Sequence, residues 1–173
     1  MVDRAKLERF MVELGRRARG PGRVYLVGGA TALWVGWREA TVDVDLKLDP
    51  EPPGIFEAIA ALKEDLDLNV ELASPDQFLP AVPGWRERSA PVGRYGQVDF
   101  YHFDYLSQAL AKLARGHDRD LTDVEAMLER GFFSTPALLA AFERIAPDLV
   151  RFPGVDADSL RQRVRAFAEQ HDG

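Results

Sequence analysis

Two aspartates, Asp43 and Asp45, are the residues whose types and spacing point most clearly to chemistry. They alternate with the apolar residues Val42, Val44 and Leu46, and an alternating pattern predicts a β-strand. Residues i and i+2 of a strand project from the same face, so the two carboxylates are expected side by side. Because neighbouring carboxylates repel each other unless a cation lies between them, the pair predicts a site for Mg²⁺ or Mn²⁺ and a phosphate-bearing ligand. The alternative is a solvent-facing edge strand on which charges discourage aggregation.

A Gly28-Gly29 turn precedes this strand in the chain. It follows an apolar stretch, residues 23–27, which predicts a strand, and it leads into a helix expected over residues 30–36. A glycine pair at this place either serves a tight turn with positive φ or lets the backbone approach a phosphate group closely. Arg38, which follows that helix, would then neutralise phosphate or pair with a neighbouring acid.

A third carboxylate beside the aspartate pair has two candidates in the strands that follow. Glu71 lies in a strand predicted over residues 68–73, and Asp99 lies in one predicted over residues 97–103. Glu71 is favoured because elements that are neighbours in sequence are usually neighbours in space. Either residue alone is more typical of a solvated strand position.

The second distinctive stretch combines two cations with two acids. Lys112 and Arg115 are three residues apart, so a helix places them on one face, which could hold the phosphates of a nucleotide. Asp120 and Asp123 open the next predicted helix. Before any resemblance is considered, their expected role is to cap backbone amides and offset the helix dipole.

Composition narrows the class of protein. The chain has 173 residues, no cysteine and a net charge of −6. The absence of cysteine excludes disulfides, thiolate zinc sites and cysteine nucleophiles. The negative charge argues against nonspecific nucleic-acid binding by the whole surface, although arginines gather near residues 16–23. No apolar run is long enough to span a membrane and no signal peptide is recognisable, so we expect a cytoplasmic protein that does not bind membranes.

The pattern along the chain predicts an α/β (α+β) fold with a small mixed β-sheet flanked by helices. Residues 1–104 are expected to form the core, and residues 105–173 a helical C-terminal region packed on it. Residues 80–91 contain several prolines and glycines and are expected to be irregular. Further helices are expected over residues 6–19, 55–66, 105–115, 121–130, 136–145 and 159–170.

These motifs together resemble the nucleotidyltransferase (polymerase-beta-like) superfamily. The resemblance rests on the Gly28-Gly29 turn, which is followed at the expected distance by Asp43-Val-Asp45, and on the strand segment with Glu71. The stretch from Lys112 through Arg119-Asp-Leu-Thr-Asp123 resembles the abortive-infection and toxin-side nucleotidyltransferases of bacterial toxin–antitoxin pairs.

The resemblance implies a metal-dependent nucleotidyltransferase that moves a nucleoside monophosphate from an NTP, such as ATP, to an acceptor hydroxyl on RNA, tRNA or protein. It implies a metal ion on Asp43, Asp45 and Glu71, with Glu71 and Lys112 also in catalytic roles. The nucleotide would meet a second set of residues: Gly28, Gly29, Thr31, Arg38, Lys112 and Asp120.

Two departures from the family pattern leave alternatives open. The turn is Gly-Gly rather than Gly-Ser, and Thr31 is the candidate to replace the serine hydroxyl. Asp99 and Asp120 rival Glu71 as the third acid. A cognate antitoxin or toxin is an expected partner. The alternative function is a catalytically silent module of the same fold that binds a nucleotide or a partner, and a purely structural domain is a third reading.

Overall fold

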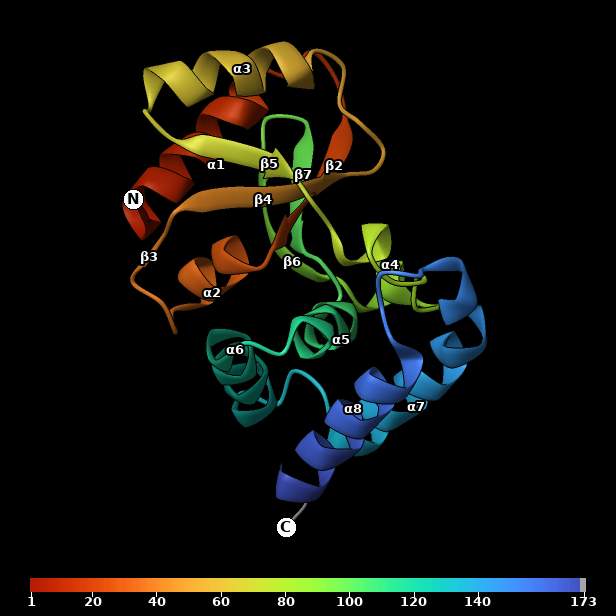
Figure 1. Cartoon of the computed structure of the whole chain (residues 1–173). Coiled ribbons are helices and arrows are strands. Elements are labelled where there is room, and N and C mark those ends of the chain that lie inside the picture. Colours follow the sequence, from red (N-terminus) through yellow and green to blue (C-terminus); the bar gives the residue numbers. More distant parts are fainter. Residues whose placement is uncertain (172–173) are drawn as a thin grey trace. The chain divides into compact units, whose positions relative to one another are not determined.

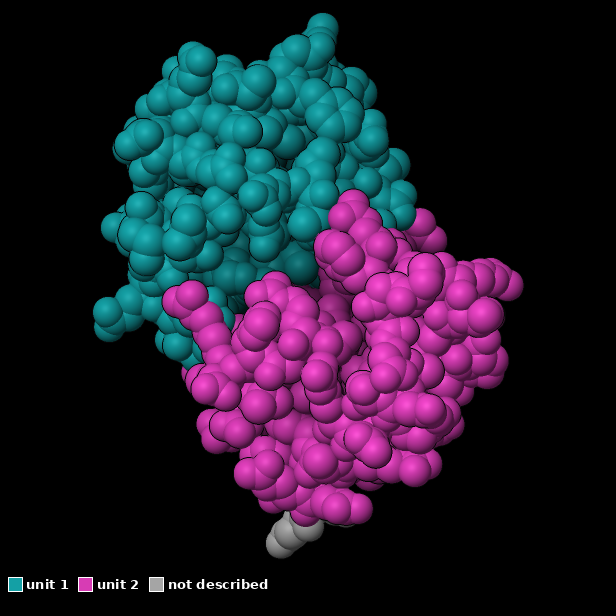
Figure 2. Space-filling model, viewed as in Figure 1, with its two compact units in different colours: residues 1–74, 89–103 teal, residues 75–88, 104–173 magenta. Residues whose placement is uncertain are grey.

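The structure is a computed structural model, and it describes residues 1–171 (Figure 1). The chain divides into two compact units, which Figure 2 shows in teal and magenta. The first unit comprises Met1–Ser74 and Ser89–Phe103, and the second comprises Pro75–Arg88 and the chain from Asp104 onward. A stretch before residue 104 therefore belongs with the helices that follow it.

The first unit is built on a mixed sheet of five strands. These strands are β2 (Gly22–Val27), β4 (Asp43–Leu48), β5 (Asn69–Leu72), β6 (Ala90–Tyr95) and β7 (Val98–His102). Their order in the sheet is β5-β4-β2-β7-β6. The β2–β7 and β4–β5 pairs are parallel, whereas the β2–β4 and β6–β7 pairs are antiparallel. A separate two-stranded ladder joins β1 (Val2–Asp3) to β3 (Ala40–Thr41).

Helices flank this sheet, which confirms the mixed α/β fold class. They are α1 (Arg4–Arg17), α2 (Gly29–Val35) and α3 (Ile55–Asp65). In Figure 1, α1 and α3 lie together on one side of the sheet, and α2 follows the end of β2. The sheet presents alternate apolar residues to the hydrophobic core because strand side chains alternate between faces. The central core residues of the strands are Val24, Leu26, Val44, Leu46 and Phe100.

Helix α1 supplies the opposite wall of that core through a stripe of residues at helical spacing. The stripe consists of Leu7, Phe10, Met11 and Leu14, all fully buried. Gly15 follows the stripe at a point where a side chain would collide with the backbone carbonyl of Tyr95 in β6. The glycine therefore lets helix and edge strand approach each other closely.

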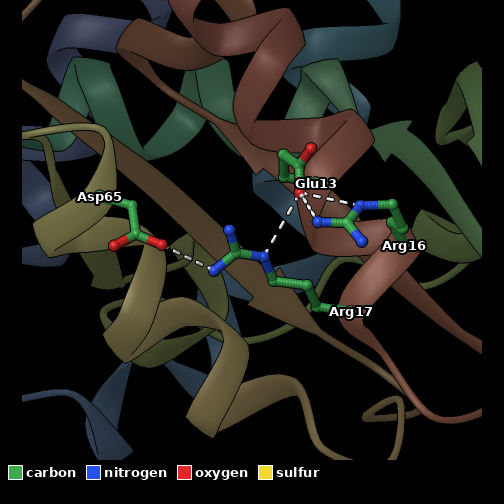
Figure 3. Close-up of polar contacts among 4 residues, drawn as sticks. All are labelled: Glu13, Arg16, Arg17 and Asp65. Carbon is green, nitrogen blue, oxygen red and sulfur yellow. Dashed lines mark hydrogen bonds and ion pairs between the residues drawn. The ribbon is translucent and has the colours of Figure 1, made fainter.

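Ion pairs link α1 to α3 on the outside of the core, as Figure 3 shows. Glu13 accepts from Arg16 at 2.7 Å, and Arg17 donates to Asp65 of α3 at 3.0 Å. Hydrogen bonding by Arg16 lowers the pKa of the Glu13 carboxyl. Arg16 and Arg17 are thus partnered by carboxylates, and exposed pairs of this kind add little stability.

The second unit is helical throughout. Its elements are η1 (Pro75–Gln77), α4 (Trp85–Arg88), α5 (Tyr105–Arg115), α6 (Asp118–Glu129), α7 (Thr135–Ile145), η2 (Ala146–Arg151) and α8 (Ala157–His171). Asp104 caps α5 by accepting from the amides of Leu106 and Ser107, and it also forms a two-pronged ion pair with Arg88 of α4. Between residues 1 and 171, no helix is both long and apolar enough to cross a membrane.

The prediction that residues 80–91 are irregular is wrong in part. The structure forms α4 there, and β6 begins at Ala90. Proline and glycine argue against a central strand, but β6 is an edge strand whose pairing with β7 shifts register between Pro91 and Gly93. An edge position and a register shift both accommodate proline because the missing N–H is not needed by a second neighbour.

Candidate functional site

The two aspartates lie on strand β4, on the face opposite the core. Val44 and Leu46 point into the core with 0% exposure, whereas Asp43 and Asp45 are partly exposed. Asp45 is the register partner of Val27 at the end of β2. The pair therefore projects beside the place where β2 ends and the Gly28-Gly29 turn begins.

Gly28 brings the turn against the Asp45 carboxylate. Its φ of 59° and ψ of −124° belong to a region that residues with side chains rarely adopt. A Cβ placed at this position would lie 3.5 Å from Oδ2 of Asp45. The backbone of the turn and one of the two carboxylates thus form one continuous surface.

Gly29 is required for a different reason. A Cβ at this position would collide with Oγ1 of Thr41 and would lie 3.1 Å from the Thr41 Cβ. The Thr41 hydroxyl donates to the carbonyl oxygen of Asp43 at 3.0 Å. A serine at position 29 would have to displace this threonine, which gives a steric reason for the Gly-Gly turn. The sequence places Thr41 between the turn and the aspartates without assigning it a role, and its nearness to Asp43 in the chain was the available signal.

Arg38 lies near the same turn. Its Nη1 is 4.0 Å from the position of a Cβ on Gly29, and its side chain is partly exposed. The turn is therefore bordered by a carboxylate at Gly28 and by a guanidinium at Gly29. A cation and a phosphate chain placed side by side match that charge distribution.

Of the three candidates for the third acid, Glu71 alone lies on a strand adjacent to β4. It is the register partner of Asp45 on β5. Asp99 lies on β7, two strands away in the sheet order, opposite Arg23 and 3.7 Å from Arg94. Asp120 belongs to helix α6 of the second unit.

Asn69, a residue that sequence reasoning did not select, links the acids. Its side-chain amide donates to Oδ1 of Asp43 at 2.9 Å and to Oε1 of Glu71 at 3.4 Å. Only the period-two spacing from Glu71 could have identified it, because its partner Asp43 comes from another strand. The amide is a neutral donor between two carboxylates on neighbouring strands.

Asp43 and Asp45 are the side chains that could hold a divalent cation in this site. In the described part of the chain, no three His, Cys, Asp or Glu side chains gather closely enough to hold one metal ion. Asp43, Asp45 and Glu71 therefore do not form a three-carboxylate cradle here. Mg²⁺ commonly takes one or two carboxylates and completes its shell with water and substrate phosphates, so Asp43 and Asp45 suit it.

Thr31, a sequence candidate for the phosphate contact, lies in the interior of the first unit. It has 0% exposure, and its hydroxyl donates to the carbonyl oxygen of Leu26 at 3.1 Å. Nδ1 of His102 lies 3.1 Å from the same hydroxyl. Burial lowers the pKa of His102 to about 4, so the imidazole is neutral at physiological pH. This environment is that of a core contact.

Lys112 and Asp120 belong to an ion cluster within the second unit. Nζ of Lys112 lies 2.8 Å from Asp123 and 3.8 Å from Asp120, and Nε of Arg115 lies 3.2 Å from Asp120. Asp120 and Asp123 are buried, with 3% and 1% exposure. Because His117 occupies the N-cap position of α6, the capping role expected for these acids is replaced by pairing with cations across α5 and α6.

Comparison with known protein families gives a match over most of the chain. A protein family described as "Nucleotidyltransferase of unknown function (DUF6036)" matches residues 6–143, which is more than half of the chain. Searches among curated proteins and among solved structures gave no match.

Proposed function

Because this chain belongs to the family of nucleotidyltransferases of unknown function that matches residues 6–143, we propose that it is a metal-dependent enzyme. The proposed reaction transfers a nucleoside monophosphate from an NTP to an acceptor hydroxyl. The observation that carries the proposal is the closeness of the glycine turn to Asp45, whose Oδ2 lies 3.5 Å from the position of a Cβ on Gly28.

The proposed site divides its residues between the metal ion and the nucleotide. Asp43 and Asp45 would hold Mg²⁺ or Mn²⁺, and the Gly28-Gly29 backbone with Arg38 would receive the phosphates. When bound, such an ion neutralises phosphate charge and makes a coordinated hydroxyl more acidic. The supporting geometry is the placement of a carboxylate on one side of the turn and a guanidinium on the other.

Glu71 is proposed as the general base. In the transfer, the acceptor hydroxyl oxygen forms a bond to the α-phosphorus, the bond from that phosphorus to the β-phosphate oxygen breaks, and pyrophosphate leaves. The acceptor proton passes to the Glu71 carboxylate. Support comes from the register of Glu71 with Asp45 on the adjacent strand and from the exposure of its side chain.

We include Lys112 in the proposed site because the stretch from Lys112 to Asp123 resembles the corresponding stretch of the family. The Lys112 ammonium has three N–H donors, and Asp120 and Asp123 of the second unit lie beside it. We include Lys112 and Asp120 as nucleotide-binding residues, and Asp123, which lies 2.8 Å from Nζ of Lys112, as the acid that orients the ammonium. The same motif supports a role as a component of a toxin–antitoxin pair, with RNA, tRNA or a protein hydroxyl as the acceptor and a cognate antitoxin as partner.

The test is transfer of label from each α-³²P-labelled NTP in the presence of Mg²⁺ or Mn²⁺ and total bacterial RNA and protein. The wild type is compared with Asp43→Ala/Asp45→Ala and with Asp99→Asn, a matched charge change on β7. We expect label in RNA or in protein with the wild type and with Asp99→Asn, and none with the double variant. Equal labelling by the double variant would overturn the proposal.

A second measurement separates the silent module from the enzyme. If nucleotide binds in a metal-dependent manner and no α-phosphate is transferred to any acceptor, the chain is a binding module of the same fold. If neither nucleotide nor Mn²⁺ binds, the aspartates are ordinary strand residues.

A further inference from the structure

Asn69 lies between two acids that the proposed reaction uses in different ways. It begins the edge strand β5, in register with Asp43 of β4, and it precedes Glu71 on the same face. Its amide donates at 2.9 Å to Asp43 and at 3.4 Å to Glu71, so the shorter contact is with the proposed metal ligand. A hydrogen bond to a carboxylate is stronger than one between neutral groups.

The amide can therefore fix the direction of the Asp43 carboxylate. It occupies one lone-pair site on Oδ1, and a carboxylate offers about four such sites, so acceptor capacity remains for a cation. Without this donor, the Asp43 and Glu71 carboxylates would repel each other across the two strands. A neutral donor separates them and adds no positive charge that would compete with a metal ion.

The same contact bears on Glu71. Its Oε1 accepts from the Asn69 amide, and Asp43, Asp45 and Glu71 do not form a group that could hold one ion. We propose that Asn69 is a positioning residue that orients Asp43 for the cation and keeps Glu71 outside the metal's ligand set, where it remains available as a base. This inference rests on the proposed function, and it separates the roles of two acids that the sequence assigns to one cradle.

Mn²⁺ affinity is the first test, measured by the electron paramagnetic resonance signal of the free ion. The variants are Asp45→Asn, Asn69→Ala and Glu71→Gln. We expect Asp45→Asn to abolish binding, Asn69→Ala to weaken it about tenfold, as is typical for a group that orients a metal ligand, and Glu71→Gln to leave it unchanged. Leu72→Ala, at an exposed position of the same strand, controls for a general disturbance of β5.

The outcomes separate the inference from the proposed function. A wild type that binds no Mn²⁺ overturns both. A wild type whose binding depends on Asp45 but not on Asn69 overturns the inference alone. Loss of affinity in Glu71→Gln as large as in Asp45→Asn also overturns it, because Glu71 would then be a ligand. Thermal unfolding of each variant identifies a simple loss of fold.

A spectroscopic test follows from the composition, since Asn69 is the single asparagine of the chain. Labelling asparagine with ¹⁵N gives one pair of side-chain amide signals in an NMR spectrum. We expect Asp43→Ala to shift this pair and Mn²⁺ to broaden it at low stoichiometry in the wild type but not in Asp45→Asn. Signals that respond to neither change would show that Asn69 is an ordinary surface residue.

Discussion

The two units each bring a pair of aspartates together, and they treat the pairs in opposite ways. On β4, Asp43 and Asp45 are partly exposed beside a glycine turn, and Asp43 accepts from a neutral amide. Between α5 and α6, Asp120 and Asp123 are buried and meet Lys112. Burying a carboxylate is costly unless a paired cation compensates it. The comparison teaches that cations of the second unit compensate its buried aspartates, whereas the first pair is partly exposed and Asp43 has a neutral donor as its partner.

The largest effect is expected at the exposed pair. Asp45→Asn should reduce nucleotide transfer by more than the roughly 100-fold typical of groups that merely orient a metal ligand, since it removes a proposed ligand itself. Because Asn keeps the size and shape of the side chain, we expect the variant to remain folded. Initial rates of α-phosphate transfer and urea unfolding test the two expectations. Undiminished transfer would remove the distinction between the two pairs.

At the buried pair we expect a loss of stability in addition to any loss of transfer. Lys112→Met leaves Asp120 and Asp123 buried without the ammonium, so the free energy of unfolding should fall by about 3–5 kcal/mol. Urea unfolding followed by circular dichroism measures this loss. Lys63→Met, at an exposed position of α3, is the matched control. If Lys112→Met is as stable as the wild type, the second cluster does not hold α5 to α6 as described.

The stability of the protein should depend on pH because His102 is buried in the first unit. Burial lowers its pKa from 6.5 to about 4, so the folded protein favours the neutral imidazole. The contribution of the neutral His102 side chain to the free energy of unfolding is fully present above pH 6.5 and is lost as the pH falls toward 4. It amounts to about 3 kcal/mol by linkage. Stability measured from pH 7.5 to 4.5 should fall less steeply in His102→Gln than in the wild type; parallel slopes would contradict the buried neutral state.

The smallest effect concerns the turn itself. Gly29→Ala places a Cβ against Thr41, and overpacking of this kind costs about 1–3 kcal/mol. Adding Thr41→Ala should recover part of the loss, since the hydroxyl is removed while the Thr41 Cβ stays at 3.1 Å. Gly154→Ala, where a Cβ meets no atom within 4 Å, serves as control. Additive effects of the two substitutions would refute the proposed contact.

Local patterns in the sequence predicted much of this architecture. The alternation around Asp43 and Asp45 predicted β4, and the predicted helix over residues 105–115 coincides with α5. These predictions succeed because the period of a strand or helix is set by covalent geometry along the chain. Edge strand β6 was missed, since proline and glycine conceal a strand whose outer side needs no partner.

The sequence by itself determined which residues could do chemistry, because residue type and spacing alone place two carboxylates on one face of a strand after a glycine turn. Only the tertiary structure decided their neighbours. It put Glu71 rather than Asp99 beside β4, brought Asn69 onto Asp43, filled the space above Gly29 with Thr41, and paired Lys112 with two buried acids. These contacts join residues far apart in the chain or across a turn, and their free energy depends on which elements pack together, which no local pattern encodes.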